Sequence, residues 1–114
     1  MKKISTSVAE SRQKTDINSR AYISINAFMI KDLHLQGEEL LAYAYIHGLN
    51  VAGYDCQLDF RESGMIFFLQ CTKEKMVEAL RSLLEKKLID ISESRVFGIL
   101  HLYMRCRYFA EDFK

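Results

Sequence analysis

Basic and aromatic side chains alternate with apolar ones along residues 96–109. The basic and aromatic series consists of His101, Tyr103, Arg105 and Arg107. A period of two is typical of a β-strand with one apolar and one exposed face. On such a face, cations can follow a phosphate backbone and aromatic rings can stack on bases. The solvated side of a half-buried strand would show the same pattern, so both interpretations stay open.

The side chains that most often serve enzymes form no recognisable catalytic pattern. There is no glycine-rich phosphate loop and no nucleophile–base spacing. The histidines are far apart in the sequence, at His34, His47 and His101. The cysteines form no C-x-x-C pair, which favours buried free thiols over a disulfide framework or a zinc site; they are Cys56, Cys71 and Cys106. We therefore expect no enzyme activity, no metal, no cofactor and no small-molecule substrate.

The most regular segment is residues 72–87, which we predict to be an amphipathic helix. Its apolar residues recur at the spacing of one buried helix face, and they are Met76, Val77, Leu80, Leu83 and Leu84. Thr72 is the expected N-cap, because its hydroxyl can accept the amide of Lys75. Lys86 and Lys87 stand where cations favour the negative end of a helix. Residues 88–92 are short and β-branched, which predicts a strand directly after the helix.

Two further strands complete the expected sheet. Residues 22–26 alternate polar and apolar side chains and predict a short N-terminal strand. Residues 96–109 should form a hairpin with the strand at 88–92, joined by the polar turn at 93–95. This turn places Arg95 near the tip of the hairpin.

The remaining segments are mostly helical. Residues 38–48 predict a buried helix with acids in its first turn and a cap at Gly48. Residues 28–35 fit either a helical turn or an extended segment, and residues 56–60 either a strand or an approach to the next helix. Residues 61–69 predict a helix ahead of the one at 72–87.

Length and charge indicate one small domain with a basic arm. The chain has 114 residues, is 49% hydrophobic and 27% charged, and carries a net charge of +1. Residues 1–20 hold five basic and two acidic residues, a net charge of +3, and predict a flexible arm that either stays free or touches phosphate. Residues 21–114 form the predicted domain. No apolar run could span a membrane or serve as a signal peptide, so we expect a cytoplasmic protein.

The order of these elements resembles the winged helix-turn-helix fold. Residues 22–48 (YISINAFMIKDLHLQGEELLAYAYIHG) and 72–89 (TKEKMVEALRSLLEKKLI) are similar to the N-terminal domain of plasmid and phage replication initiators of Gram-positive bacteria. The resemblance implies an α+β fold with a helical core, a C-terminal hairpin wing and a short N-terminal strand.

The resemblance also implies double-stranded DNA as partner and a role in transcriptional regulation or in replication of a mobile element. The helix at 72–87 would read the major groove and the hairpin would contact the backbone. A homodimer on a two-fold DNA site is one possible form, and the sequence leaves the oligomeric state open. Including the basic strand face, the candidate DNA-binding residues are Thr72, Lys73, Lys75, Arg81, Arg95, Arg105 and Arg107.

A second hypothesis is that this domain binds protein and no longer binds DNA. Glu74 and Glu78 lie among the candidate DNA contacts and would repel phosphate. The run at 65–69 is continuously apolar, so Met65, Phe67 and Phe68 are either buried or form an interface with a partner. Exposure of a positive surface on the helix at 72–87 would separate the two hypotheses.

Overall fold

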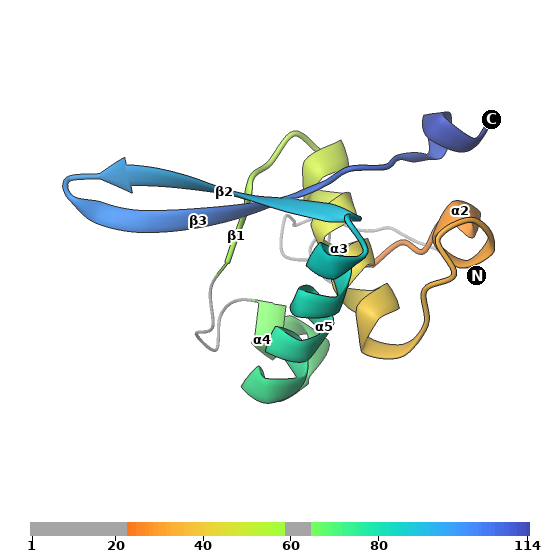
Figure 1. Cartoon of the computed structure of the whole chain (residues 1–114), viewed down its shortest axis with the longest axis horizontal. Helices are drawn as coiled ribbons and strands as arrows, with labels where there is room; N and C mark the ends of the chain where they lie inside the picture. The colour runs from red at the N-terminus through yellow and green to blue at the C-terminus, as the bar shows by residue number, and fades with distance from the viewer. Residues whose placement is uncertain (1–22, 59–64) are drawn as a thin grey trace, which may run out of the picture.

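The chain folds as a mixed α+β protein in which a small three-stranded antiparallel sheet lies against a group of helices (Figure 1). The computed structural model describes residues 23–58 and 65–114, without the side chains of Phe67 and Phe68. The elements are α2 (Ala27–Lys31), α3 (Gly37–Val51), β1 (Cys56–Gln57), α4 (Met65–Leu69), α5 (Lys73–Glu85), β2 (Ile89–Val96), β3 (Ile99–Cys106) and the 3-10 helix η1 (Ala110–Phe113).

The core is built around α3, which contacts α2, α4, α5, β1 and β3. Its fully buried face includes Tyr43 and Ile46, each with no exposed surface. The Tyr43 hydroxyl donates a hydrogen bond to the carbonyl oxygen of Tyr108 at 2.7 Å. This bond ties the central helix to the segment that follows the last strand.

The predicted helix at 72–87 is confirmed as α5, and so is its cap. The Thr72 hydroxyl accepts the amide of Lys75 at 3.1 Å. The buried face is narrower than predicted, because Leu84 is 38% exposed and Val77 is half-buried. Both lie on the flank of the helix about 80–100° from its buried centre at Met76, beyond the reach of α3.

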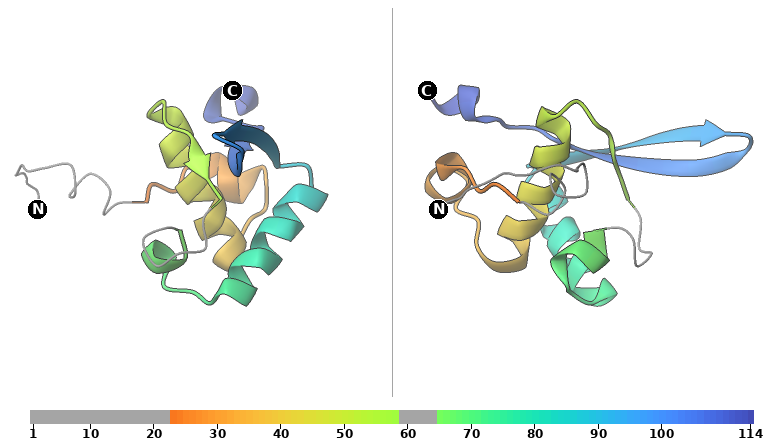
Figure 2. Two further views of the ribbon diagram at one scale, coloured as in Figure 1. Left: turned by 90° about the vertical axis from the view of Figure 1, so that its left-hand side faces the viewer. Right: turned by 180° about the vertical axis from the view of Figure 1, so that it is seen from behind.

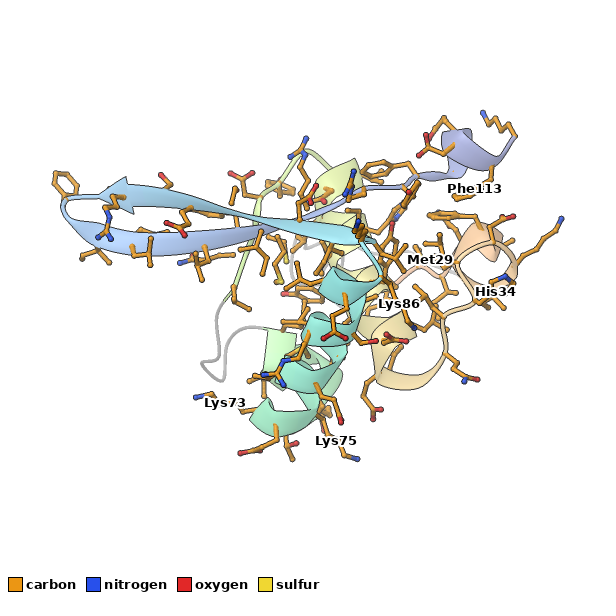
Figure 3. The ribbon with its side chains drawn as sticks, viewed as in Figure 1. Met29, His34, Lys73, Lys75, Lys86 and Phe113 are labelled. Carbon is orange, nitrogen blue, oxygen red and sulfur yellow. The ribbon has the colours of Figure 1, made fainter. Side chains whose placement is uncertain are left out.

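An ion pair fixes the end of α5 against the start of α3. Lys86 Nζ lies 2.9 Å from Glu39 Oε1, and the Ser82 hydroxyl also donates to the Glu39 carboxylate. Partial burial would raise the pKa of Glu39, but the hydrogen bonds from Lys86 and Ser82 bring it below its usual value. These contacts set the position of α5 on the core (Lys86 is labelled in Figure 3).

The sheet has the order β1-β3-β2, so β3 is its central strand. At the base of the hairpin Ile89 lies opposite Cys106, and both are buried. Residues 92–100 are exposed on both strands because this part of the hairpin extends beyond the helices. The right-hand view of Figure 2 shows this projection, and the left-hand view looks along the hairpin from its tip.

The predicted strand at 22–26 is wrong for the residues that the structure describes. Residues 23–26 pair with no strand there, and Ile25 is 45% exposed. Both edges of β3 are already occupied by β1 and β2. Residues 23–26 lead directly into α2, which resolves the open question of residues 28–35 in favour of a helical turn.

The predicted cap at Gly48 is also wrong, since α3 continues to Val51. Tertiary contacts hold the additional turn. The Asn50 side-chain oxygen accepts the amide of Cys106 at 2.8 Å, and its side-chain nitrogen donates to the Tyr54 carbonyl at 3.3 Å. The left-handed glycine after the helix is Gly53, with φ of +89°.

The turn of the hairpin lies three to four residues beyond its predicted position at 93–95. Phe97 and Gly98 form it, with φ of +52° and +77°, the signs that a two-residue hairpin turn of type I′ requires. Residues 93–95 belong to β2 and are polar because that part of the strand is exposed. Arg95 still lies close to the tip, opposite Leu100.

An aromatic cluster attaches η1 to the helical core. The Phe113 ring stacks on Phe28 with centroids 5.5 Å apart; Figure 3 labels Phe113 near α2. His47 on α3 lies among these rings, 5.5 Å from Phe28 and 5.3 Å from Phe109, and is only 6% exposed.

Candidate nucleic-acid interface

The exposed surface of α5 carries balanced charge. Three basic and three acidic side chains are exposed along the helix, namely Lys73, Lys75, Arg81, Glu74, Glu78 and Glu85. The positive charge that the sequence places at 72–87 therefore comes from Lys86 and Lys87 at the end of the helix. Since Lys86 is paired with Glu39, it contributes little to a positive surface.

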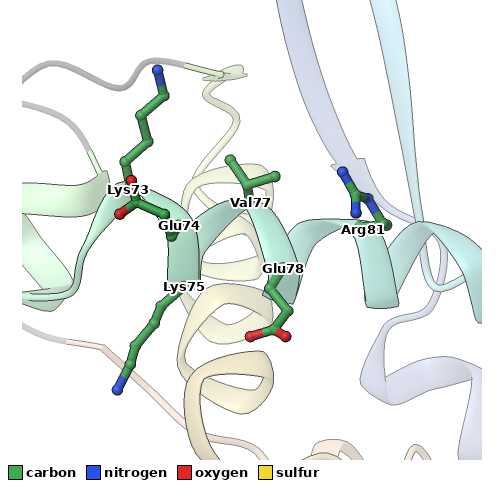
Figure 4. Close-up of a pocket in the computed structure, with 6 residues that line it drawn as sticks. All are labelled: Lys73, Glu74, Lys75, Val77, Glu78 and Arg81. Carbon is green, nitrogen blue, oxygen red and sulfur yellow. The ribbon is translucent and has the colours of Figure 1, made fainter.

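The basic residues of α5 lie on two different flanks. Lys73 and Arg81 share one side with Val77, and this side faces the direction in which the hairpin extends (Figure 4). Lys75 points to the opposite side, together with Glu78. Lys73 and Arg81 thus share a flank about two turns apart, and Lys75 points away from it, although all three line one open hollow along α5.

Lys75 lies in acidic surroundings. With Glu38, Glu39 and Glu78 it lines a shallow hollow between α5 and the start of α3. The carboxylates around it oppose the attraction of its ammonium for a phosphate. The hydroxyl of Thr72 is already used as the helix cap, so its observed role is structural.

Arg95 faces the same side of the molecule as the flank formed by Lys73 and Arg81. Successive side chains of a strand alternate between faces, so Arg95 shares a face with Ile89 and Ile91, which pack toward the helices at the base of the hairpin. Its guanidinium Nη1 lies 3.5 Å from the carbonyl oxygen of Gly98. The tip of the hairpin thus brings Arg95 to the side of the sheet that faces the helices, together with the acid Glu93 two positions before it.

Arg105 and Arg107 lie on the other face of the sheet. They alternate with Met104 and Cys106, which are buried against the helices. Arg107 Nε is 3.6 Å from Asp90 Oδ2 in an exposed ion pair. The two arginines therefore form a surface separate from α5.

The candidate partner interface at 65–69 is only partly described. Met65 is 4% exposed and belongs to the core, so it is unavailable to a partner. The prediction for Phe67 and Phe68 concerns side chains outside the described part of the chain. The predicted arm at 1–20 also lies outside it.

The turn between α4 and α5 has the backbone conformation that a glycine usually supplies. Gln70 adopts φ of +57°, which is uncommon for a residue with a side chain. The amide of Cys71 donates to the carbonyl of Ile66 across this turn, at 3.3 Å. The two helices are thereby connected as a tight unit.

The exposed apolar tip of the hairpin was not predicted from the sequence. Phe97 is fully exposed, and Val96, Ile99 and Leu100 are between 44% and 61% exposed. The sequence does contain a signal for the turn, which is Phe97-Gly98 between two alternating segments. Asn-Gly is the usual pair at such a position. A bulky residue there is unexpected on grounds of turn chemistry.

The cysteines are free thiols, and two of them are buried as predicted. Burial raises the pKa of Cys56 to about 12 and that of Cys106 to about 12, which leaves almost no nucleophilic thiolate near neutral pH. Cys71 is half-buried. Within residues 23–58 and 65–114, no three histidine, cysteine or acidic side chains lie close enough to hold a metal ion.

Comparison of the chain with models of protein families, with curated proteins and with solved structures finds no match. None of the helices in the described part of the chain has both the length and the apolar content needed to cross a bilayer.

Proposed function

We propose that this chain is a small DNA-binding protein of the winged-helix type, acting in transcriptional regulation or in replication. The architecture supports this proposal. One unit consists of α4, a tight turn at Gln70 and α5, and the β2–β3 hairpin follows it. A helix presented after a short turn and flanked by a hairpin is the arrangement on which the resemblance to winged helices was based.

The observation that carries the proposal is the shared orientation of α5 and the hairpin. Lys73 and Arg81 point toward the side to which the hairpin extends, and Arg95 lies on the facing surface of that hairpin. Strands of this length span roughly 25 Å, which exceeds the roughly 12 Å width of the major groove. With α5 in the groove, the hairpin would reach the neighbouring phosphate backbone.

Fluorescence anisotropy of a labelled random-sequence duplex, titrated at several salt concentrations, tests the proposal. Each phosphate contact contributes about 0.9 to the slope of log affinity against log salt. The variant Arg81→Ala/Arg95→Ala removes one cation from α5 and one from the side of the hairpin that faces the helices. We expect its slope to be smaller by up to about 1.8 and its low-salt affinity to be reduced.

The matched control is Arg105→Ala/Arg107→Ala, which removes the same charge from the opposite face of the sheet. We expect it to keep most of the salt slope. Equal losses for the two variants would show that net charge alone drives binding. If the unmodified protein fails to bind duplex even at low salt, the proposal is wrong.

The balanced charge of α5 supports a second candidate function, a winged-helix module that binds protein. Its three exposed acids would disfavour phosphate and suit a partner with mixed charge. This function predicts no salt-dependent DNA binding and an effect of α5 charge reversals on partner binding only.

A further inference from the structure

In the part of the chain that the structure describes, β2 forms the longer of the two open edges of the sheet, since β1 has only two residues. The order β1-β3-β2 leaves β2 with a neighbour on one side only. The amide of Arg107 donates to the carbonyl of Leu88 at 3.0 Å, in line with the register of β2 and β3. Hydrogen-bonded and non-bonded pairs alternate in an antiparallel ladder. The even-numbered residues of β2 therefore bond to β3, and the odd-numbered residues direct their backbone groups to the free edge.

The free edge has a self-complementary charge pattern. Its exposed outward-bonding residues include Glu93 and Arg95, two positions apart on one face. If two copies of β2 pair antiparallel around a two-fold axis at Ser94, Glu93 of each copy lies opposite Arg95 of the other. Both belong to the set that can hydrogen-bond across the edge. Shifting the axis to Glu93 or to Arg95 would place like charges opposite each other, which is destabilising.

The same register gives the exposed tip of the hairpin a place to pack. Phe97 is 100% exposed and adopts φ of +52°, a conformation that is strained for a bulky side chain. Nothing in the described part of the chain offsets this strain by burying the ring. With the axis at Ser94, residue 97 of one copy lies beside Ile91 of the other, at the base of its hairpin.

The area also favours strand pairing over contact through the tips alone. The apolar tip consists of four side chains, whereas a stable interface usually involves about 20–30 residues per partner. Pairing along residues 91–97 would also bury backbone groups of both strands and side chains on both faces of the sheet. The hairpin projects away from the helices, so the two bodies would lie at opposite ends of the joined strands (Figure 1).

We propose that the chain forms a two-fold homodimer by antiparallel pairing of β2 with β2 of a second copy, centred on Ser94. The two sheets become one continuous six-stranded sheet in the order β1-β3-β2-β2-β3-β1. Reciprocal Glu93–Arg95 pairs fix the register, and each Phe97 covers the base of the other hairpin. This proposal does not depend on DNA binding.

Charge reversal tests the pairing by sedimentation equilibrium over a range of protein concentrations. Arg95→Glu alone and Glu93→Arg alone each convert both cross-strand attractions into repulsions, so we expect at least about tenfold weaker dimerisation. A mixture of the two variants restores two opposite-charge pairs and should form a heterodimer. Lys31→Glu, at an exposed site on α2, is the matched control and should dimerise like the unmodified protein.

A cysteine scan tests the register. Ser94 lies opposite itself in a non-hydrogen-bonded pair, where Cα atoms are about 4.5 Å apart, a separation that a disulfide can bridge. Ser94→Cys should therefore give a disulfide-linked dimer under mild oxidation. Ser92→Cys is the control, because its two copies would be four residues out of register and more than about 13 Å apart.

Three results would overturn the proposal: an unmodified protein that stays monomeric at high concentration, dimers that persist in Arg95→Glu, or equal crosslinking at Ser92 and Ser94. Circular dichroism of each variant ensures that a monomeric variant is still folded. Loss of DNA binding with an intact dimer would refute only the proposed function.

Discussion

Acid should destabilise this protein through His47, before its carboxylates are protonated. The ring lies between Phe28, Tyr43 and Phe109 and is 6% exposed. Burial lowers the pKa of His47 below the usual 6.5, although the charge of Glu111 acts in the opposite direction. In the unfolded chain the same ring returns to a pKa near 6.5.

The sign of the effect follows from these two pKa values. Below about pH 6.5 the unfolded chain takes up a proton that the folded protein resists, so the free energy of unfolding decreases. The contribution of His47 is complete above that pH and is lost as pH falls toward the folded pKa. One proton limits the slope to about 1.4 kcal/mol per pH unit. Glu39, with its lowered pKa, adds its own loss only below about 4.5.

Urea unfolding of the unmodified protein and of His47→Leu, between about pH 7.5 and pH 5, measures this effect. We expect the free energy of unfolding to fall in the unmodified protein and to change much less in His47→Leu. His34→Asn is the control for loss of a histidine, since His34 is exposed and asparagine tolerates its φ of +57°. Equal slopes for the unmodified protein and His47→Leu would refute the reasoning.

Three other substitutions have expected effects on stability, each measured by urea unfolding in dilute solution with the unmodified protein as reference. Thr72→Ala removes the cap on the amide of Lys75 and should cost about 1 kcal/mol; Thr72→Ser should recover most of this loss, and no loss in Thr72→Ala would contradict the cap. Tyr43→Phe leaves the carbonyl of Tyr108 without its donor and should cost about 1–2 kcal/mol, whereas a neutral result would mean that water replaces the hydroxyl. Phe97→Asn should stabilise the monomer by about 1 kcal/mol, because asparagine accepts the left-handed turn and no buried contact is lost; a loss of stability would show that the ring packs within the monomer.

The sequence was most informative where local chemistry and burial agree. For α5, the spacing of Met76, Leu80 and Leu83 matches one helix face, and the hydroxyl of Thr72 needs only the amide three residues later. The hairpin after α5 followed from such a pattern as well. Each depends on residues that are close together in the chain, so no tertiary information was needed.

The errors occurred where distant contacts decide the structure. The pattern at 22–26 could not reveal that β1 takes the edge of β3. The extension of α3 beyond Gly48 depends on Asn50 reaching Cys106, which is 56 residues away in sequence. Likewise, only the fold shows that Lys75 turns toward the acids of α3 and that Arg105 lies on the face opposite to Arg95.

The dependence of α3 on β3 has a consequence for protein synthesis. β1 pairs with β3 alone, and the Tyr43 hydroxyl donates to a carbonyl that lies 65 residues further along the chain. While the ribosome is still making the segment between them, the apolar face of α3 has no sheet to cover it. We therefore expect the nascent chain to expose that face to chaperones until β3 has left the exit tunnel, and to fold in one late step rather than helix by helix.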